Sequence, residues 1–267
     1  MILKLLLSSF LLALATQAST INIKKIQNDF YKKVTLKSAH AKKIKKFTLT
    51  KKYFKRAKKQ LFKKRKYLKK SQFVSLIDLS RQVMILSVWD QQKKDFFPIG
   101  FDYISSGDIN REIETKKGQD HYVKTPQGFF KIKSGWRSYG ETNKDNIVKP
   151  YGRKGLFIFN FGIQNSVRYH TYDKNGKRIK NKKKWKLINA KLHFAMHAHS
   201  TTQTLGIPRS HGCIRMSEPF NKYLDNNFVF FNHLYKKNRW THPYQSAPKH
   251  PRNQKLAGQY LMVRDKI

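Results

Sequence analysis

The sequence contains one cysteine, Cys213, and the residue types around it are suited to nucleophilic chemistry. It lies in the run Ser-His-Gly-Cys-Ile-Arg-Met at 210–216, sixteen positions after His197. A free thiol has a pKa of about 8.5, so little of it is ionised at neutral pH, and an imidazole that accepts its proton makes it a better nucleophile. A lone cysteine can equally be an inert, buried residue. The nearby histidines favour the nucleophile.

Two alternating segments would bring an imidazole to the sulfur. If the chain around Cys213 is extended, His211, Cys213 and Arg215 project to one face, and Gly212 allows a close backbone approach. Residues 192–199 alternate in the same way. If the two segments are adjacent strands, a histidine from the second lies beside the thiol.

Three histidines share one face of that second segment, namely His193, His197 and His199. A His-x-His pair on a strand can bind zinc, so a zinc hydrolase that uses these histidines with Cys213 is an alternative. No Asp or Glu lies close to them in sequence to orient the ligands. Outside such a site, His193 is expected to be a core or edge residue.

The run at 210–216 resembles the Ser/Thr-His-Gly-Cys signature of the L,D-transpeptidase catalytic domain (YkuD) family. Met-His-Ala at 196–198 falls where that family has its upstream histidine. Residues 75–88 resemble its opening hairpin, and Thr-Pro-Gln-Gly-Phe-Phe at 125–130 resembles its Thr-Pro-x-Gly-x-Phe turn and strand. The resemblance covers residues 73–226, and the run that contains the cysteine is its most specific part.

The resemblance implies a role for each matching residue. Cys213 would be the nucleophile, and His197 the general base that later protonates the leaving amine. The backbone carbonyl of Ala198 would orient the imidazole. His199 departs from the small or hydroxyl residue usual at its position, so it is either a solvent-facing neighbour or a competitor for the role of base.

Other motif residues would support the site. His211 is a further candidate catalytic residue. Arg215 would bind a substrate carboxylate or else neutralise a surface acid, and Ser210 would hold the turn through its hydroxyl or touch substrate. Backbone amides around Gly212 and Cys213 would supply oxyanion donors.

The first 18 residues are typical of a secretory signal peptide. Lys4 precedes an apolar stretch at 5–14, and small residues end at Ala18. The apolar stretch is too short to span a bilayer comfortably. We therefore expect cleavage after Ala18 and an exported protein of the periplasm or cell envelope, where an unpaired thiol is a candidate reactive group.

The chain is strongly basic, with 57 Lys and Arg against 15 Asp and Glu and a formal net charge of +42. Residues 21–70 contain 21 basic residues and one acid, Asp29, whereas residues 71–267 contain 35 basic and 14 acidic residues. Such a charge favours anionic partners. We divide the chain into the signal peptide 1–18, a basic N-terminal arm at 19–70 and a catalytic domain at 71–267 with its core at 73–226.

The arm contains a candidate amphipathic helix at 51–70. Phe54, Ala57, Leu61 and Leu68 fall near helical spacing among lysines and arginines. Such a helix could attach the protein to anionic wall polymer or to lipid headgroups, or be a solvated or disordered arm. Phosphate neutralisation needs only charge, but export argues against nucleic acid as the partner.

From Phe73 onward the pattern predicts a mainly β domain of the L,D-transpeptidase type, a sandwich or barrel with few short helices. The expected strands are 73–79, 82–88, 96–104, 128–133, 156–161, 192–199 and 211–216, with 258–263 as a closing edge strand. A helix is expected at 218–226, with Ser217 as N-cap and Pro219 in its first turn. Residues 103–121 and 174–186 are expected to be loops.

Taken with the resemblance, these features predict an exported cysteine transpeptidase that acts on peptidoglycan stem peptides and needs no cofactor or metal. The family chemistry is a thioester with the stem peptide, followed by transfer to an amine. A stem peptide, a protein lysine, a D-amino acid or water could be the acceptor, and water would make the protein an L,D-carboxypeptidase. A non-enzymatic basic wall-binding protein is a further alternative, although it gives the cysteine run no purpose.

Overall fold

A computed structural model describes residues 21–35, 46–111, 122–132, 134–142, 149–200, 204–230 and 253–267. The expected signal peptide and most of the expected loop at 103–121 lie outside these residues. In the part of the chain that is described, no helix is long and apolar enough to cross a membrane.

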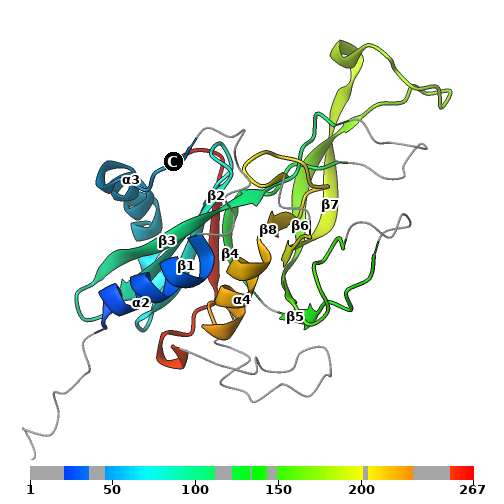
Figure 1. The fold of residues 1–267 in the computed structure, drawn as a ribbon. Helices are drawn as coiled ribbons and strands as arrows, with labels where there is room; N and C mark the ends of the chain where they lie inside the picture. The colour runs from blue at the N-terminus through cyan, green and yellow to red at the C-terminus, as the bar shows by residue number, and fades with distance from the viewer. Residues whose placement is uncertain are drawn as a thin grey trace, which may run out of the picture.

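The fold is built on one curled, mixed sheet of nine strands in the order β4-β9-β1-β2-β3-β8-β7-β6-β5 (Figure 1). Neighbours pair antiparallel except for β1 with β9 and β7 with β8, which are parallel. The strands are β1 (Gln72–Asp78), β2 (Val83–Asp90), β3 (Asp95–Ser105), β4 (Gly128–Lys131), β5 (Ser134–Arg137), β6 (Phe157–His170), β7 (Lys186–Ala198), β8 (Ile214–Met216) and β9 (Tyr260–Arg264). This confirms the predicted mainly β fold.

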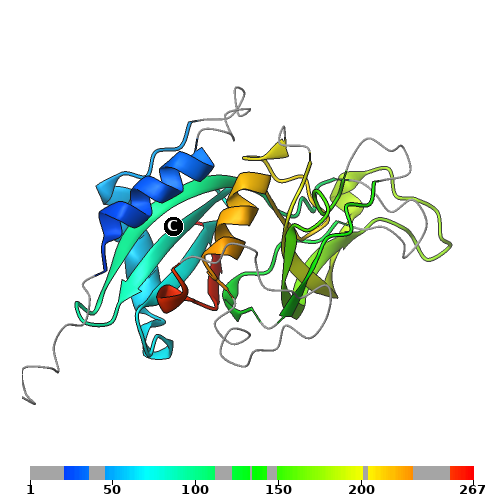
Figure 2. The same ribbon diagram turned by 60° about the horizontal axis from the view of Figure 1, so that its bottom comes forward.

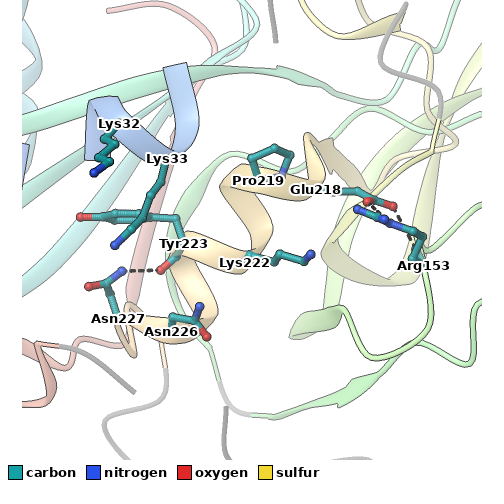
Figure 3. Close-up of a pocket in the computed structure, with 9 residues that line it drawn as sticks. All are labelled: Lys32, Lys33, Arg153, Glu218, Pro219, Lys222, Tyr223, Asn226 and Asn227. Atoms are coloured by element: carbon teal, nitrogen blue, oxygen red, sulfur yellow. Dashed lines mark hydrogen bonds and ion pairs between the residues drawn. The ribbon is translucent and has the colours of Figure 1, made fainter. Parts of the chain in front are cut away.

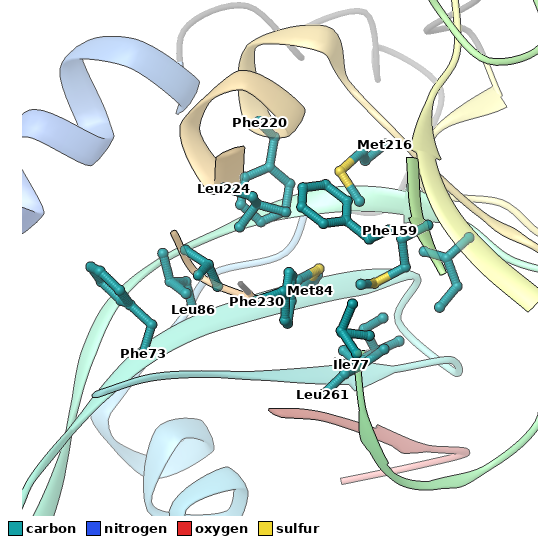
Figure 4. Packing of buried hydrophobic residues seen from close by; sticks show 14 of the residues in the cluster. Phe73, Ile77, Met84, Leu86, Phe159, Met216, Phe220, Leu224, Phe230 and Leu261 are labelled. Carbon is teal, nitrogen blue, oxygen red and sulfur yellow. The ribbon is translucent and has the colours of Figure 1, made fainter. Parts of the chain in front are cut away.

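Strands β1 and β2 are buried along their whole length because both faces of the sheet are covered. Along β1, Phe73 and Ile77 face one apolar cluster, while Val74 and Leu76 face the other. Figure 4 shows the first cluster, in which α4 (Glu218–Asn226) packs over the sheet through Phe220 and Leu224. The half of the sheet that contains β7 and β8 is thus continuous with a core that is packed on both faces.

The N-terminal arm contributes to both cores. Helix α2 (Ile23–Phe30) and the short π-helix η1 (Tyr31–Thr35) pack beside β3 and α4 (Figure 2). Phe30 is fully buried, and its ring packs edge-on against Phe220 and Tyr223. A Cβ on Gly100 of β3 would lie 2.3 Å from the Phe30 ring, so glycine lets the helix approach the strand.

Helix α3 (Lys51–Phe62) covers the other face of the sheet and confirms the predicted amphipathic helix, although it ends at Phe62. Its buried side chains include the predicted Phe54, Ala57 and Leu61, while Leu68 is buried beyond the short helix η2 (Arg65–Tyr67). Thr50 is the N-cap of this helix, and its hydroxyl accepts a hydrogen bond from the Tyr53 amide at 3.1 Å.

Helix α4 has the predicted bounds and caps. The Ser217 hydroxyl accepts from the Phe220 amide and donates to Asp102 of β3 at 2.6 Å. At its other end, Asp225 pairs with Arg137 of β5, with one hydrogen bond of 3.2 Å. These bonds fix the segment that follows the cysteine run to two separate strands.

Most expected strands match the structure within a few residues, and the larger differences are in β5 to β8. Strands β6 and β7 extend far beyond 156–161 and 192–199, and β5 was not expected. Strand β8 begins at Ile214 rather than at His211. Within 174–186, the short helix η3 (Lys182–Lys184) interrupts the expected loop, and residue 186 already belongs to β7.

Candidate active site

Ser210 holds the turn that presents the cysteine. Its buried hydroxyl accepts a hydrogen bond from the Gly212 amide at 3.1 Å and donates to the Cys213 carbonyl. Of the two roles expected for Ser210, this geometry supports the one in which its hydroxyl holds the turn. The Gly212 amide is already engaged, so its use as an oxyanion donor would require this bond to break.

Gly212 is required by the close packing behind the turn. Its φ is +139°, and a Cβ there would lie 2.4 Å from Val123 and 2.9 Å from the Phe194 ring. The Thr125 hydroxyl donates to the Gly212 carbonyl at 2.7 Å and accepts from the Gly107 amide at 2.9 Å. Thr125 belongs to the Thr-Pro turn noted in the sequence, yet its role at the cysteine was not foreseen.

The hairpin between β1 and β2 is also tied to the turn. The Gln82 side chain donates to the Ser106 hydroxyl and accepts from the Ser106 amide, both at 2.8 Å. The Ser106 carbonyl in turn accepts from the Ser210 amide at 2.9 Å. Hydrogen bonds of the backbone and of the Gln82 side-chain amide thus connect the cysteine turn to the buried part of the sheet.

Parallel pairing of β7 and β8 places the strand that contains His197 next to the segment that contains Cys213. In this register His197 lies opposite Arg215, and Met196 lies opposite Ile214. Cys213 comes directly before β8 and is hydrogen-bonded to the backbone at Ala195. Adjacent strands therefore bring the two segments together as expected. His211 and Cys213 lie in a bend, so the predicted shared face of an extended strand is wrong for that pair.

The His197 ring is buried and oriented by a backbone carbonyl. Its Nδ1 lies 2.9 Å from the Ala198 oxygen, and because a carbonyl only accepts, Nδ1 carries the proton of the neutral ring. Nε2 is then the basic nitrogen. Burial lowers the pKa of His197 to about 4, helped by the charges of Arg215 and His199, while the carbonyls of Ala198 and Pro150 act in the opposite direction.

Cys213 is the only cysteine of the chain, and its thiol is partly buried. Burial raises the pKa of the thiol, whereas the backbone bond at Ala195 and the positive charge of Arg215 lower it by less. The resting thiol is therefore neutral at pH 7. Because Arg215 acts on the pKa of both Cys213 and His197, the three side chains share one electrostatic environment.

Tyr151 is a site residue that the sequence did not reveal. Its ring meets the His197 ring edge-on with centroids 4.9 Å apart, and its pKa is raised by burial and then by Cys213. The next residue, Gly152, has φ +75°, and a Cβ there would lie 2.8 Å from the Ala198 side chain. Glycine thus lets this loop sit against the end of β7 and places Tyr151 over the imidazole.

The motif residues beyond the cysteine lie among aromatic and basic groups. His211 is exposed and stacks on Tyr122 with centroids 4.2 Å apart. The guanidinium groups of Arg215 and Arg111 both donate to the Arg209 carbonyl, at 3.4 and 3.3 Å. Within the described residues, no ion pair joins Arg215 to an acid, so its alternative role as neutraliser of a surface acid finds no partner there.

The two other histidines of this segment, His193 and His199, lie in different surroundings. His193 is exposed on the strand opposite Ile163, whereas His199 is buried just past the strand end. The burial of His199 rules out the solvent-facing position expected as one alternative. Among the described residues, no group of three or more His, Cys, Asp or Glu side chains is placed to hold a metal ion.

Comparison with known proteins gives one family. The model of the L,D-transpeptidase catalytic domain (YkuD) matches residues 72–229, more than half of the chain. No curated protein matches this chain significantly.

Solved structures are similar to part of the chain. An L,D-transpeptidase from Mycobacterium smegmatis has 11% identity and a TM-score of 0.31 over 73% of this chain and 59% of that one. Bd1075 of Bdellovibrio bacteriovorus has 17% identity and a TM-score of 0.35 over 73% of this chain and 49% of that one. The aligned region therefore spans only about half to three fifths of these structures.

Proposed function

This chain belongs to the L,D-transpeptidase catalytic domain (YkuD) family, and from that membership we propose that it is a peptidoglycan L,D-transpeptidase with Cys213 as its nucleophile. The observation that supports the proposal is the pairing of β7 with β8, which places the strand of His197 next to the cysteine turn, with Nδ1 bonded to the Ala198 carbonyl. Nε2 is left to accept the thiol proton.

In the acylation step the Cys213 sulfur attacks the carbonyl carbon of the third, L-centred stem residue, and His197 Nε2 takes the thiol proton. The tetrahedral intermediate collapses as the carbon–nitrogen bond breaks. His197 returns the proton to the leaving amine of the terminal D-amino acid, and a thioester remains on the enzyme. An amine acceptor, its proton taken by His197, then attacks the thioester and restores the thiol.

Neutral resting groups suit this sequence of proton transfers. A neutral thiol needs a base at the moment of attack, and a neutral imidazole whose Nε2 carries no proton supplies one. We assign Arg215 to a substrate carboxylate because it is the cation next to both groups. Tyr151, against the imidazole, limits the movement of the base.

We further propose that the protein is exported and acts in the periplasm or cell envelope, where its substrate lies. The signal-like residues 1–18 and the basic charge support this. The acceptor is proposed to be an amine, and water as acceptor would give carboxypeptidase action.

Incubation of the purified protein with tetrapeptide muropeptides, followed by liquid chromatography and mass spectrometry, tests the proposal. We expect loss of the terminal D-amino acid together with cross-linked dimers or, when a second D-amino acid is added, exchanged tetrapeptides. Tripeptides alone would identify water as the acceptor. Unchanged tetrapeptides would contradict the function.

A further inference from the structure

Two cavities lie away from the cysteine turn, and their charges differ. The first, about 470 Å³, lies between η1 and α4 (Figure 3). Two of its basic side chains are neutralised, because Arg153 pairs with Glu218 and Lys33 pairs with Asp29. Lys32 and Lys222 also line it and form no ion pair within the described residues, so two cations of this cavity stay uncompensated.

The second cavity, about 360 Å³, is where α3, the segment before it and the β1–β2 turn meet. We call it the basic cavity. Lys46 precedes α3, Lys52 and Arg56 lie one turn apart on α3, and Arg81 comes from the turn. The hydroxyl-bearing Thr48 and Ser80 also line it. Within the described residues, none of the ion pairs includes any of its four cations.

The acidic side chain beneath the cavity already accepts hydrogen bonds from its neighbours. Asp78 is buried and accepts hydrogen bonds from the Tyr53 hydroxyl, from Ser80 Oγ at 2.7 Å and from the Arg81 amide at 3.2 Å. The Arg56 guanidinium lies 5.2 Å from the centre of the Tyr53 ring. The pKa of Tyr53 is raised by burial and by Asp78 and is lowered by the charges of Arg81 and Arg56, so both guanidinium groups lie close to this one phenol.

We propose that the basic cavity binds a phosphate group. A carboxylate carries one charge and two oxygens, whereas a phosphate monoester carries a charge of about −1.5 to −2 and three acceptor oxygens. The second set of properties matches two guanidinium forks, two ammonium groups and the Thr48 hydroxyl, which converge from separate segments. The proposal does not depend on the transpeptidase assignment, since no residue of the cysteine turn lines the cavity.

Isothermal titration calorimetry of the purified full chain with pyrophosphate, at constant ionic strength, tests this site. We expect one saturable site in the wild type. The double variant Lys52→Gln/Arg56→Gln and the single variant Arg81→Gln should each raise Kd at least about tenfold. The matched control Lys55→Gln/Lys59→Gln, on the same helix but outside the cavity, should change Kd less than about twofold.

Equal weakening in the cavity and control variants would mean that pyrophosphate senses only general charge, and would overturn the proposal. Absence of a saturable wild-type site would overturn it as well. Circular dichroism of each variant separates loss of binding from loss of fold. Activity on soluble stem peptides should stay at the wild-type level in the cavity variants.

The source of the phosphate is tested by sedimentation with vesicles that contain phosphatidic acid, whose headgroup is a phosphate monoester, with phosphatidylcholine vesicles as control. If the cavity variants lose vesicle binding and the control variant does not, a lipid headgroup supplies the phosphate. If all variants bind vesicles like the wild type while pyrophosphate binding is lost, the ligand is a soluble phosphate ester.

Discussion

The pKa shifts of Cys213 and His197 run in opposite directions, and both favour the neutral form. Burial raises the pKa of the thiol and lowers that of the imidazole to about 4. A resting thiolate–imidazolium pair would need the reverse order of pKa values. The proton is therefore expected to move only during attack on substrate, which makes the orientation of His197 by the Ala198 carbonyl central to the rate.

Replacement of Cys213 by Ala tests the nucleophile. We expect kcat/KM to fall at least about 10³-fold, because the sulfur forms the covalent intermediate and no second thiol can replace it. Intact-protein mass spectrometry should show an acyl adduct on the wild type only. Unchanged circular dichroism would confirm that the fold is kept, and an adduct on the variant would refute the assignment.

The pH dependence tests the neutral pair. With a His197 pKa of about 4, kcat/KM should hold its value as the pH falls below 6 and decline only near 4. A histidine with the ordinary pKa of about 6.5 would make kcat/KM decline near that pH. Alkylation of Cys213 by iodoacetamide should still accelerate with pH above about 8.5, because the thiol pKa is raised. A plateau of alkylation from neutral pH upward would instead indicate a preformed thiolate.

His199 offers a way to separate base from neighbour. His197→Ala should reduce acylation by about 10² to 10⁴, as loss of a general base does. His199→Gln should reduce it less. Because the charge of His199 contributes to the lowered pKa of His197, the same variant should move the acidic limb of the pH profile upward. The reverse order of rate losses would make His199 the base.

At the scale of elements, the sequence predicted the strand that contains His197 and the helix α4, because periodicity and capping are properties of neighbouring residues. The expected strand at 211–216 was wrong at its start, where residues 211–213 form a bend. Tyr151 and Thr125 could not be found in this way, because loops bring them to the site from distant parts of the chain. The local signals were the glycine that follows Tyr151 and the Thr-Pro turn that contains Thr125.

The long β6–β7 hairpin shows why strand limits were missed. Its outer part pairs from Ile163 with His193 to His170 with Lys186, where most side chains are partly or fully exposed. Apolar residues still alternate with polar ones in this stretch, as Ile188, Ala190 and Leu192 do on β7, but their side chains are only partly buried. The apolar signal is therefore weaker there than at the buried ends that lead into the site, although the backbone pairing continues.

Phe30 tests whether α2 is a structural part of the domain. Phe30→Ala removes a fully buried ring between β3 and α4, and we expect it to lower the free energy of unfolding by about 3 to 5 kcal/mol. Its neighbour Tyr31, with 42% of its surface exposed, is the matched control, and Tyr31→Ala should cost less than about 1 kcal/mol. Urea unfolding measures both. Equal, small effects would mean that α2 packs only loosely.

At the scale of the whole molecule, deleting the N-terminal arm would remove basic charge and core residues together, so a deletion cannot measure the effect of the charge alone. The arm supplies Phe30 and Val34 to one core and Tyr53, Phe54 and Leu61 to the other. Removing residues 21–70 would therefore expose both faces of the sheet and abolish the fold. The contribution of the charge must be measured with substitutions on exposed positions instead.

The lysines on the exposed side of α3 and just after it test attachment to the cell wall. Lys51, Lys55, Lys59, Lys63 and Lys66 are exposed, and changing all five to Gln removes five charges without touching the core. We expect weaker sedimentation with isolated sacculi at low salt and a flatter dependence on salt, because attraction between exposed charges is screened over about 8 to 10 Å at physiological ionic strength. Activity on soluble muropeptides should not change.

A second set of five exposed lysines provides the control for that experiment. Lys174, Lys177, Lys180, Lys183 and Lys184 lie at the tip of the β6–β7 hairpin, so their replacement by Gln removes the same charge from another surface. If the arm holds the protein on the wall, only the α3 set weakens sedimentation. Equal weakening by both sets would assign the affinity to the net charge of +42 as a whole, since long-range attraction depends on total charge more than on its position.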